Sequence, residues 1–193
     1  MTPMKIVGLG GASNPHRSCM AALDVALAGA LAEGAEIVRL DVHQLDLPMY
    51  RYGVTLPEVE PIIDAVRSAH GMIWCSPLYH GSVAGAFKNA LDWLELLSDD
   101  KPPYLTNKVV GLIATSGGDQ ALHAVTTMSS IAHSLRAWTA PLTAPVLRAD
   151  TAFDDSGAPR QQRLANLLAQ VGRDVTRAAA ALGPATLGPA TLG

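Results

Sequence analysis

The chain has 193 residues, about half of them apolar, and a formal net charge of −3 with only 16% charged residues. This length and composition suffice for one domain with a substantial core. The near-neutral charge offers no basic field for nucleic acid or an anionic membrane, so we expect neither as a partner. The two cysteines lack CxxC and zinc-ligand spacing, and no apolar run resembles a signal peptide or a membrane span. We therefore expect reduced thiols, no metal site and a cytoplasmic protein.

Short apolar runs alternate with helical patterns along the chain. Strands are expected at 6–9, 36–40, 71–75, 109–114 and 137–146, the last interrupted by a proline. Helices are expected at 19–31, 61–70, 84–97, 121–135 and 160–182. The proline-bearing stretch 47–53 fits neither pattern and is expected to be a loop over the active face.

This alternation predicts an α/β fold with a parallel, doubly wound sheet between two helical layers. We expect one domain over residues 1–182, followed at 183–193 by a disordered Gly/Pro tail that repeats the pentamer Gly-Pro-Ala-Thr-Leu. In such sheets a ligand binds beyond the carboxyl ends of the strands, where the strand order reverses. The loops after the first, third and fourth strands are therefore expected to build the site.

The first of these loops reads Gly10-Gly11-Ala12-Ser13-Asn14-Pro15-His16-Arg17-Ser18. Its hydroxyls and guanidinium stand just before a helix, where free backbone N–H groups and the helix dipole favour an anion such as phosphate. A plain turn with a helix cap fits the same residues, and this alternative stays open here. Neither GxGxxG nor GxxxxGK[ST] is present, which disfavours a dinucleotide-type Rossmann domain and a Walker ATPase.

The loop after the third strand carries a longer pattern. It reads Cys75-Ser76-Pro77-Leu78-Tyr79-His80-Gly81-Ser82, and the next helix carries Lys88-Asn89-Ala90-Leu91-Asp92-Trp93. This stretch resembles the signature of the NAD(P)H-dependent FMN reductase family, in which S/T-P-x-Y-x-G-S ends a strand and K-N-A-x-D-W lies on the following helix. The loops at 10–18 and 114–118 are similar to the family's other two loops, so the resemblance covers roughly residues 4–150. The chain departs from the family at Gly10-Gly11-Ala12-Ser13, where the usual opening is G-S-x-R.

The resemblance implies a flavodoxin-like three-layer fold with five parallel strands in the order 2-1-3-4-5. It also implies FMN as cofactor and NADPH or NADH as co-substrate. The implied contacts of the FMN phosphate are Ser13, His16, Arg17 and Ser18. Those along the ring are Pro77, Leu78, Tyr79, His80, Gly81 and Ser82, with Ser116, Gly117 and Gly118 at its other edge. No side chain is expected to be catalytic, because the flavin itself carries the hydride.

The implied function is an NAD(P)H-dependent flavin reductase in which hydride passes from nicotinamide C4 to flavin N5 by a ping-pong route. The acceptor is a small molecule, either flavin or quinone-like, and a flavin-dependent monooxygenase is a candidate partner for the reduced flavin. One alternative is a reductase of quinones, azo dyes or chromate. A second is a flavodoxin-like electron carrier, against which the near-neutral charge argues, and a third is a flavin-free domain on the same fold.

Several further residues have both an ordinary and a functional interpretation. Lys88 and Asp92 are four apart on one helical face and can form an ion pair. The apolar residues of the same helix are either ordinary core or, as the resemblance implies, part of an interface in a homodimer or dimer of dimers, namely Trp93, Leu94, Leu96 and Leu97. The loop residues Met49, Tyr50 and Tyr52 either cover the flavin or a partner's site, or form a plain surface loop. Packed or surface roles are expected for His123, His133 and Cys19.

Overall fold

The computed structural model describes residues 3–183 of the chain. The tail repeat expected at 183–193 lies, apart from Gly183, outside the described residues. The strands are β1 (Lys5–Gly10), β2 (Glu36–Asp41), β3 (Gly71–Tyr79), β4 (Ser82–Val83), β5 (Val109–Thr115), β6 (Trp138–Thr139) and β7 (Ala144–Val146). The helices are α1 (Arg17–Ala32), α2 (Val42–Leu45), α3 (Glu60–Ser68), α4 (Gly85–Asp92), α5 (Leu122–Ser134), α6 (Ala149–Ala152) and α7 (Gln162–Leu182), with 3₁₀ turns at Pro57–Val59 and Trp93–Leu97.

The main sheet is parallel, with strand order β2-β1-β3-β5-β6. The last strand is split, because β6 and β7 pair with opposite ends of β5 on either side of residues 140–143, which include Pro141. Proline has no N–H to donate to a ladder, so a break is expected there. The predicted order 2-1-3-4-5 and the proline-interrupted last strand are thus confirmed.

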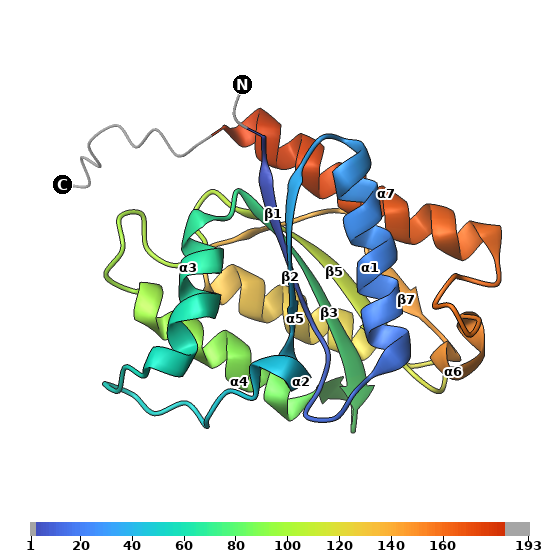
Figure 1. The fold of residues 1–193 in the computed structure, drawn as a ribbon, viewed down its shortest axis with the longest axis horizontal. Helices are drawn as coiled ribbons and strands as arrows, with labels where there is room; N and C mark the ends of the chain where they lie inside the picture. Colours follow the sequence, from blue (N-terminus) through green and yellow to red (C-terminus); the bar gives the residue numbers. More distant parts are fainter. Residues whose placement is uncertain (1–2, 184–193) are drawn as a thin grey trace.

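Helices cover both faces of the sheet (Figure 1). One buried cluster joins the sheet to α3, α4 and α5, and includes Trp74, Phe87 and Leu112. The other joins it to α1 and α7, and includes Leu23, Ile73 and Val171. Because neighbouring residues of β3 point to opposite faces, its apolar run serves both clusters, as expected of a parallel sheet that is buried on both sides.

Helices α1 and α7 touch at two glycines. A Cβ on Gly29 would clash with the backbone of Ala169, and one on Gly172 would clash with the backbone of Ala26. Only glycine lets the two backbones approach this closely. This contact fixes α1, and therefore the loop that precedes it, against the closing helix.

The end of β3 differs from the expectation. The sequence predicts that the strand stops at Cys75, but it continues to Tyr79, and the short strand β4 was not predicted. Here β5 runs alongside, with Pro77 opposite Thr115, while β1 has already ended opposite Cys75. Pro77 is therefore tolerated, because the strand has a parallel neighbour on only one side at this point.

Candidate functional site

The loop between β1 and α1 is fixed against β3 at its start. The N–H of Gly11 donates to the carbonyl oxygen of Cys75 at 3.2 Å, and Gly11 has φ +106°, a conformation that favours glycine. Beyond it, Ser13 is exposed, and its carbonyl oxygen lies 2.9 Å from His43 Nδ1. The loop thus crosses the carboxyl end of the sheet and brings Ser13 to the surface.

Helix α1 begins without a side-chain cap. Its N-cap is His16, whose side chain makes no capping hydrogen bond, and the first turn holds no acidic residue. A side chain such as Ser13 or Ser18 that capped the helix would have supported the plain-turn alternative. The first N–H groups of a helix need an acceptor, so this start is suited to an anion.

His16 connects the first loop to the second. It is half-buried, burial lowers its pKa, and its Nδ1 is buried with no hydrogen-bond partner among the described residues. Its ring centroid lies 6.3 Å from that of Tyr79 at a tilt of 48°. An unpartnered buried nitrogen is rare in a folded protein and marks a place where a polar group is missing.

Arg17 points away from the first loop. Its Nη2 donates to the carbonyl oxygens of Asp155 and, at 3.4 Å, Asp154, and its Nη1 lies 3.8 Å from the Asp155 carboxylate. The side chain is still 64% exposed, so these contacts are weak restraints. The resemblance assigns Arg17 to phosphate, and in this structure it instead bridges to the segment before α7.

This bridge closes one wall of a cavity of about 310 Å³ next to the start of α1. The cavity is lined by Pro15, His16, Arg17 and Ser18 from the first loop and by Ala149, Asp150, Phe153, Asp154, Asp155 and Arg160 from the segment around α6. Sequence reasoning missed the second group. The sequence of this segment predicts only a turn, from the run Asp-Asp-Ser-Gly at 154–157. It does not indicate which distant loop the turn contacts.

The second loop is a tight β-hairpin. Strands β3 and β4 pair antiparallel, with Leu78 opposite Val83 and Tyr79 opposite Ser82. The two turn residues, His80 and Gly81, have φ of 49° and 83°, as a type I′ turn requires. The hairpin exposes Tyr79, His80 and Gly81 at the carboxyl end of the sheet, while Pro77 stays buried.

The third loop, which follows β5, is fixed by one hydrogen bond within the loop and one to β7. Ser116 Oγ donates to the carbonyl oxygen of Gly118 at 2.7 Å, and Ser116 N donates to the carbonyl oxygen of Val146 at 3.0 Å. A Cβ on Gly117 or Gly118 would meet nothing within 4 Å, so the backbone here borders open space. Directly before the loop, Thr115 Oγ1 is buried and has no partner among the described residues.

The loop after α2 is clamped by α4. Asn89 is buried, its Oδ1 accepts from Tyr50 N at 2.8 Å, and its Nδ2 donates to Pro48 O at 2.9 Å. Trp93 Nε1 donates to the same carbonyl at 2.8 Å, and its ring meets Tyr50 edge-on at 5.3 Å. The clamp leaves Met49 and Tyr52 exposed at 75% and 86%.

The apolar side of the helix at 84–97 is mostly core. Trp93, Leu94 and Leu97 are fully buried, which supports the ordinary-core interpretation for these three. Lys88 and Asp92 form the expected ion pair, Nζ to Oδ1 at 2.5 Å.

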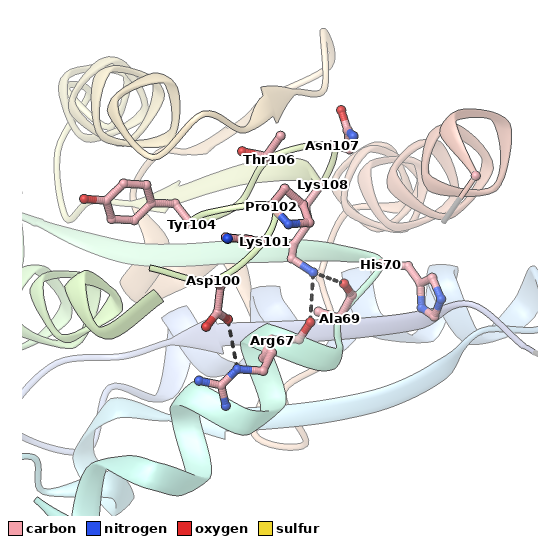
Figure 2. Close-up of a pocket in the computed structure, with 11 residues that line it drawn as sticks. Arg67, Ala69, His70, Asp100, Lys101, Pro102, Tyr104, Thr106, Asn107 and Lys108 are labelled. Carbon is pink, nitrogen blue, oxygen red and sulfur yellow. Dashed lines mark hydrogen bonds and ion pairs between the residues drawn. The ribbon is translucent and has the colours of Figure 1, made fainter. Parts of the chain in front are cut away.

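A larger cavity, of about 420 Å³, lies at the opposite end of the sheet, where β3 and β5 begin (Figure 2). Two of its cations, Lys108 and Arg67, are already engaged. Lys108 donates to the carbonyl oxygens of Arg67 and Ala69, and burial lowers its pKa, while Arg67 pairs with Asp100 at 2.9 Å. This cavity also lies at the amino ends of the strands, away from the edge where parallel sheets bind ligands.

Comparison with known proteins identifies the family of this chain. The profile of the family described as NADPH-dependent FMN reductase matches residues 4–151. The chain belongs to this family. The match spans all three loops and ends at residue 151. It therefore leaves out the later residues that line the 310 Å³ cavity, namely Phe153, Asp154, Asp155 and Arg160.

Curated relatives carry related names. The NADPH-dependent FMN reductase ArsH of Acidithiobacillus ferrooxidans is 36% identical over 104 residues, which are 54% of this chain and 44% of that protein. A quinone reductase of Escherichia coli is 35% identical over 77 residues, which are 35% of this chain and 41% of that protein. The chain thus spans about half the length of the curated relatives it matches.

Solved structures agree on the fold. The flavoenzyme NAD(P)H:(acceptor) oxidoreductase FerB from Paracoccus denitrificans superposes with a TM-score of 0.71 at 21% identity, covering 94% of this chain and all of that one. RosB, solved with 8-demethyl-8-formylriboflavin-5′-phosphate, gives a TM-score of 0.75 at 18% identity, covering 93% of this chain and 80% of that one. This member of the FMN reductase family therefore has the flavodoxin-like fold that the sequence predicted.

The remaining candidates do not join the site. His123 and His133 are exposed on α5, and the described residues hold no group of three or more His, Cys, Asp or Glu suited to a metal ion. None of the helices within residues 3–183 combines the length and apolarity needed to cross a membrane.

Proposed function

We propose that this chain is an NAD(P)H-dependent reductase that binds FMN at the carboxyl edge of its sheet. The observation that carries the proposal is the uncapped start of α1, which borders a cavity and lies next to a buried His16 nitrogen that no other atom of residues 3–183 pairs with. Membership of the FMN reductase family supports the same assignment. The residues fit the cofactor, because this edge combines anion-binding N–H groups with an open, partly aromatic surface.

The phosphate would lie at the first turn of α1. Backbone N–H groups there, with the hydroxyls of Ser13 and Ser18, supply donors, and His16, whose buried Nδ1 has no partner among the described residues, lines the same cavity. Arg17 would exchange its backbone acceptors in the segment before α7 for phosphate oxygens. A guanidinium gains more from a charged, bidentate acceptor than from two carbonyl groups and an exposed carboxylate 3.8 Å away, so we expect this exchange.

The ring would lie between the hairpin and the third loop. Leu78 and Tyr79 offer apolar and aromatic surface above the buried Pro77, and the turn at His80 and Gly81 with Ser82 brings backbone close to one edge. Ser116, Gly117 and Gly118 border the other edge, where no side chain fills the space. Directly before this loop, Thr115 Oγ1 is a further buried group that has no partner among the described residues.

Bound FMN supplies the redox chemistry, accepting hydride from a nicotinamide nucleotide and passing electrons to an acceptor. The chain's own contribution is to orient the ring and to hold donors at its edges. The backbone at Gly117 and Gly118 borders open space, so we expect the nicotinamide nucleotide and the acceptor to reach the ring from this surface. Because nucleotide and acceptor would share this one surface, a ping-pong sequence is expected.

The proposal also covers the domain extent, the location, the acceptor and the assembly of the protein. We assign residues 1–182 to one domain, the protein to the cytoplasm, and the acceptor to the class of flavins or quinone-like molecules. A partner monooxygenase would receive reduced flavin if FMN leaves the site after reduction. We propose a homodimer or dimer of dimers through exposed apolar residues at the carboxyl edge, namely Met49, Tyr52, Tyr79 and Leu122.

The proposal is tested by initial rates of NADPH and NADH oxidation under anaerobic conditions. FMN, a quinone, an azo dye and chromate serve in turn as acceptors, at several concentrations each. Parallel double-reciprocal plots are expected for the preferred acceptor. Converging plots would exclude the shared surface, and no oxidation with any acceptor would exclude the reductase and favour an electron carrier.

A further inference from the structure

Two thiols face each other in the core. Cys19 Sγ and Cys75 Sγ are 3.2 Å apart, and both side chains are fully buried. Each thiol also lies within hydrogen-bond reach of the other residue's backbone: Cys19 Sγ is 3.1 Å from Cys75 O, and Cys75 Sγ is 3.2 Å from Cys19 O. The sequence separates them by 56 positions and predicts independent inert thiols, so this contact is a product of the fold.

The pair lies directly beneath the first loop. Cys19 follows Arg17 and Ser18 in the first turn of α1. Cys75 is in β3, and its carbonyl oxygen also accepts the hydrogen bond from Gly11 that fixes the start of the loop. Both ends of the loop are therefore attached to the same residue of β3, one through the backbone and one through the thiols.

We propose that Cys19 and Cys75 form a reversible oxidation site, which a hydroperoxide converts to an intramolecular disulfide that weakens cofactor binding at the loop above. The effect on cofactor binding rests on the proposed function, and the formation of the disulfide does not. No third ligand accompanies the thiols within the described residues, which favours a disulfide over a metal centre.

The chemistry balances with hydrogen peroxide as the oxidant. One thiol sulfur attacks the peroxide, the O–O bond breaks, and a sulfenic acid and one water are formed. The second thiol attacks that sulfur, the S–S bond forms, the S–O bond breaks, and the departing oxygen leaves as a second water. Two thiols and one peroxide thus give one disulfide and two waters, and an added dithiol reverses the result by exchange.

The positions of the two sulfurs suggest separate roles. Cys19 lies in the first turn of α1, at the end of the helix that carries the partial positive charge of the dipole. Burial and the neighbouring Cys19 thiol raise the pKa of Cys75, which makes this thiol the weaker nucleophile of the two. Cys19 is therefore the first sulfur to react, and Cys75 the one that closes the bond.

Closing the bond would move the loop. The sulfurs must approach from 3.2 Å to about 2.05 Å. Cys75 is held in the sheet between β1 and β5, so the displacement falls on the first turn of α1. Those N–H groups are the ones assigned to phosphate, and we expect FMN affinity to fall about tenfold, which corresponds to about 1.4 kcal/mol.

The test begins with the wild-type protein. It is treated with a small excess of hydrogen peroxide, quenched, and analysed by intact mass, by titration of free thiols after denaturation, and by peptide mapping. The expected product is a monomer that has lost two hydrogens and both free thiols, gives a Cys19–Cys75 linked peptide, and recovers its thiols with dithiothreitol. Retention of both thiols, or a gain of oxygen without cross-linking, overturns the proposal.

Two variants and a binding measurement complete the test. The folding of the variants Cys19→Ala and Cys75→Ala is checked by circular dichroism. After peroxide treatment neither variant should show the mass loss of two hydrogens, and Cys19→Ala should consume peroxide more slowly than Cys75→Ala. FMN affinity is measured on reduced and oxidised wild type. Equal FMN affinities of the reduced and oxidised protein overturn the proposed effect of the disulfide on cofactor binding. Failure of the reduced protein to bind FMN counts against the proposed function and does not affect the test of disulfide formation.

Discussion

The side-chain amide of Asn89 holds the backbone of Tyr50, whose N–H donates to Asn89 Oδ1 at 2.8 Å. Asn89 and Trp93 belong to the K-N-A-x-D-W motif by which the sequence resembles its family. In the structure both side chains donate to the carbonyl oxygen of Pro48, and they thereby clamp the loop that follows α2. This part of the motif therefore has a structural explanation.

Replacing Asn89 by alanine should destabilise the protein by about 2 kcal/mol, because the change leaves a backbone donor without its buried partner. The loop at 47–53 should also become more sensitive to trypsin at Arg51. Urea unfolding and timed proteolysis measure the two effects. Asn166→Ala, which removes an exposed amide on α7, is the matched control and should change stability by less than about 0.5 kcal/mol. Equal effects of the two substitutions would contradict the clamp.

Replacing Arg17 by alanine should weaken FMN binding about tenfold and leave riboflavin binding unchanged, because the guanidinium is assigned to the phosphate that riboflavin lacks. Fluorescence titration with both flavins measures this difference. Arg177→Ala is a suitable control, since Arg177 forms an exposed pair with Glu33 far from the loop. A parallel loss for FMN and riboflavin would show that Arg17 acts through the fold and not through phosphate.

Replacing Gly117 by valine should weaken FMN and riboflavin to the same extent, by about tenfold or more, because a side chain would enter the space assigned to the ring. Stability should change by less than about 1 kcal/mol, since a Cβ there meets no atom within 4 Å. Thermal unfolding without flavin and titration with both flavins give the two values. Unaltered binding of both flavins would place the ring elsewhere.

The stability of the flavin-free protein should fall as the pH drops below about 7. Burial lowers the pKa of His16, so the unfolded chain takes up a proton near pH 6.5 that the folded chain accepts only at lower pH. The extra proton bound by the unfolded state lowers stability through this window. Urea unfolding at pH 7.5 and 5.5 should show a smaller pH effect for His16→Gln than for wild type. With exposed His123→Gln as control, an unchanged pH effect in His16→Gln would refute the assignment.

Much of the fold could be predicted because its signals are local. The apolar runs around Val7, Ile73 and Val110 mark the strands, and alanine-rich segments between them mark the helices. The end of β3 was predicted wrongly because Pro77 is a local signal for a break, whereas the pairing with Thr115 that keeps the strand intact is tertiary. The same applies to β4, whose two residues form a strand only because Leu78 and Tyr79 lie opposite them.

The positions of the candidate site residues in the fold were predictable to a similar extent. Gly10 and Gly11 before a helix predict a loop at the carboxyl end of β1, where the structure has one, and the hairpin residues are adjacent in sequence. The second wall of the cavity was not predictable, because the Arg17 contact spans 138 positions to Asp155. The facing thiols of Cys19 and Cys75 were missed for the same reason, since their proximity depends on how α1 packs on β3.

The most direct test of the central claim is the reduction of FMN on the protein in a single turnover. Equimolar protein and FMN are mixed anaerobically with NADPH in a stopped-flow spectrometer, and the visible absorption of FMN is followed. We expect bleaching many times faster than for free FMN, with the acceleration lost in Gly117→Val. Bleaching no faster than without protein, although FMN is bound, would contradict the proposed reductase.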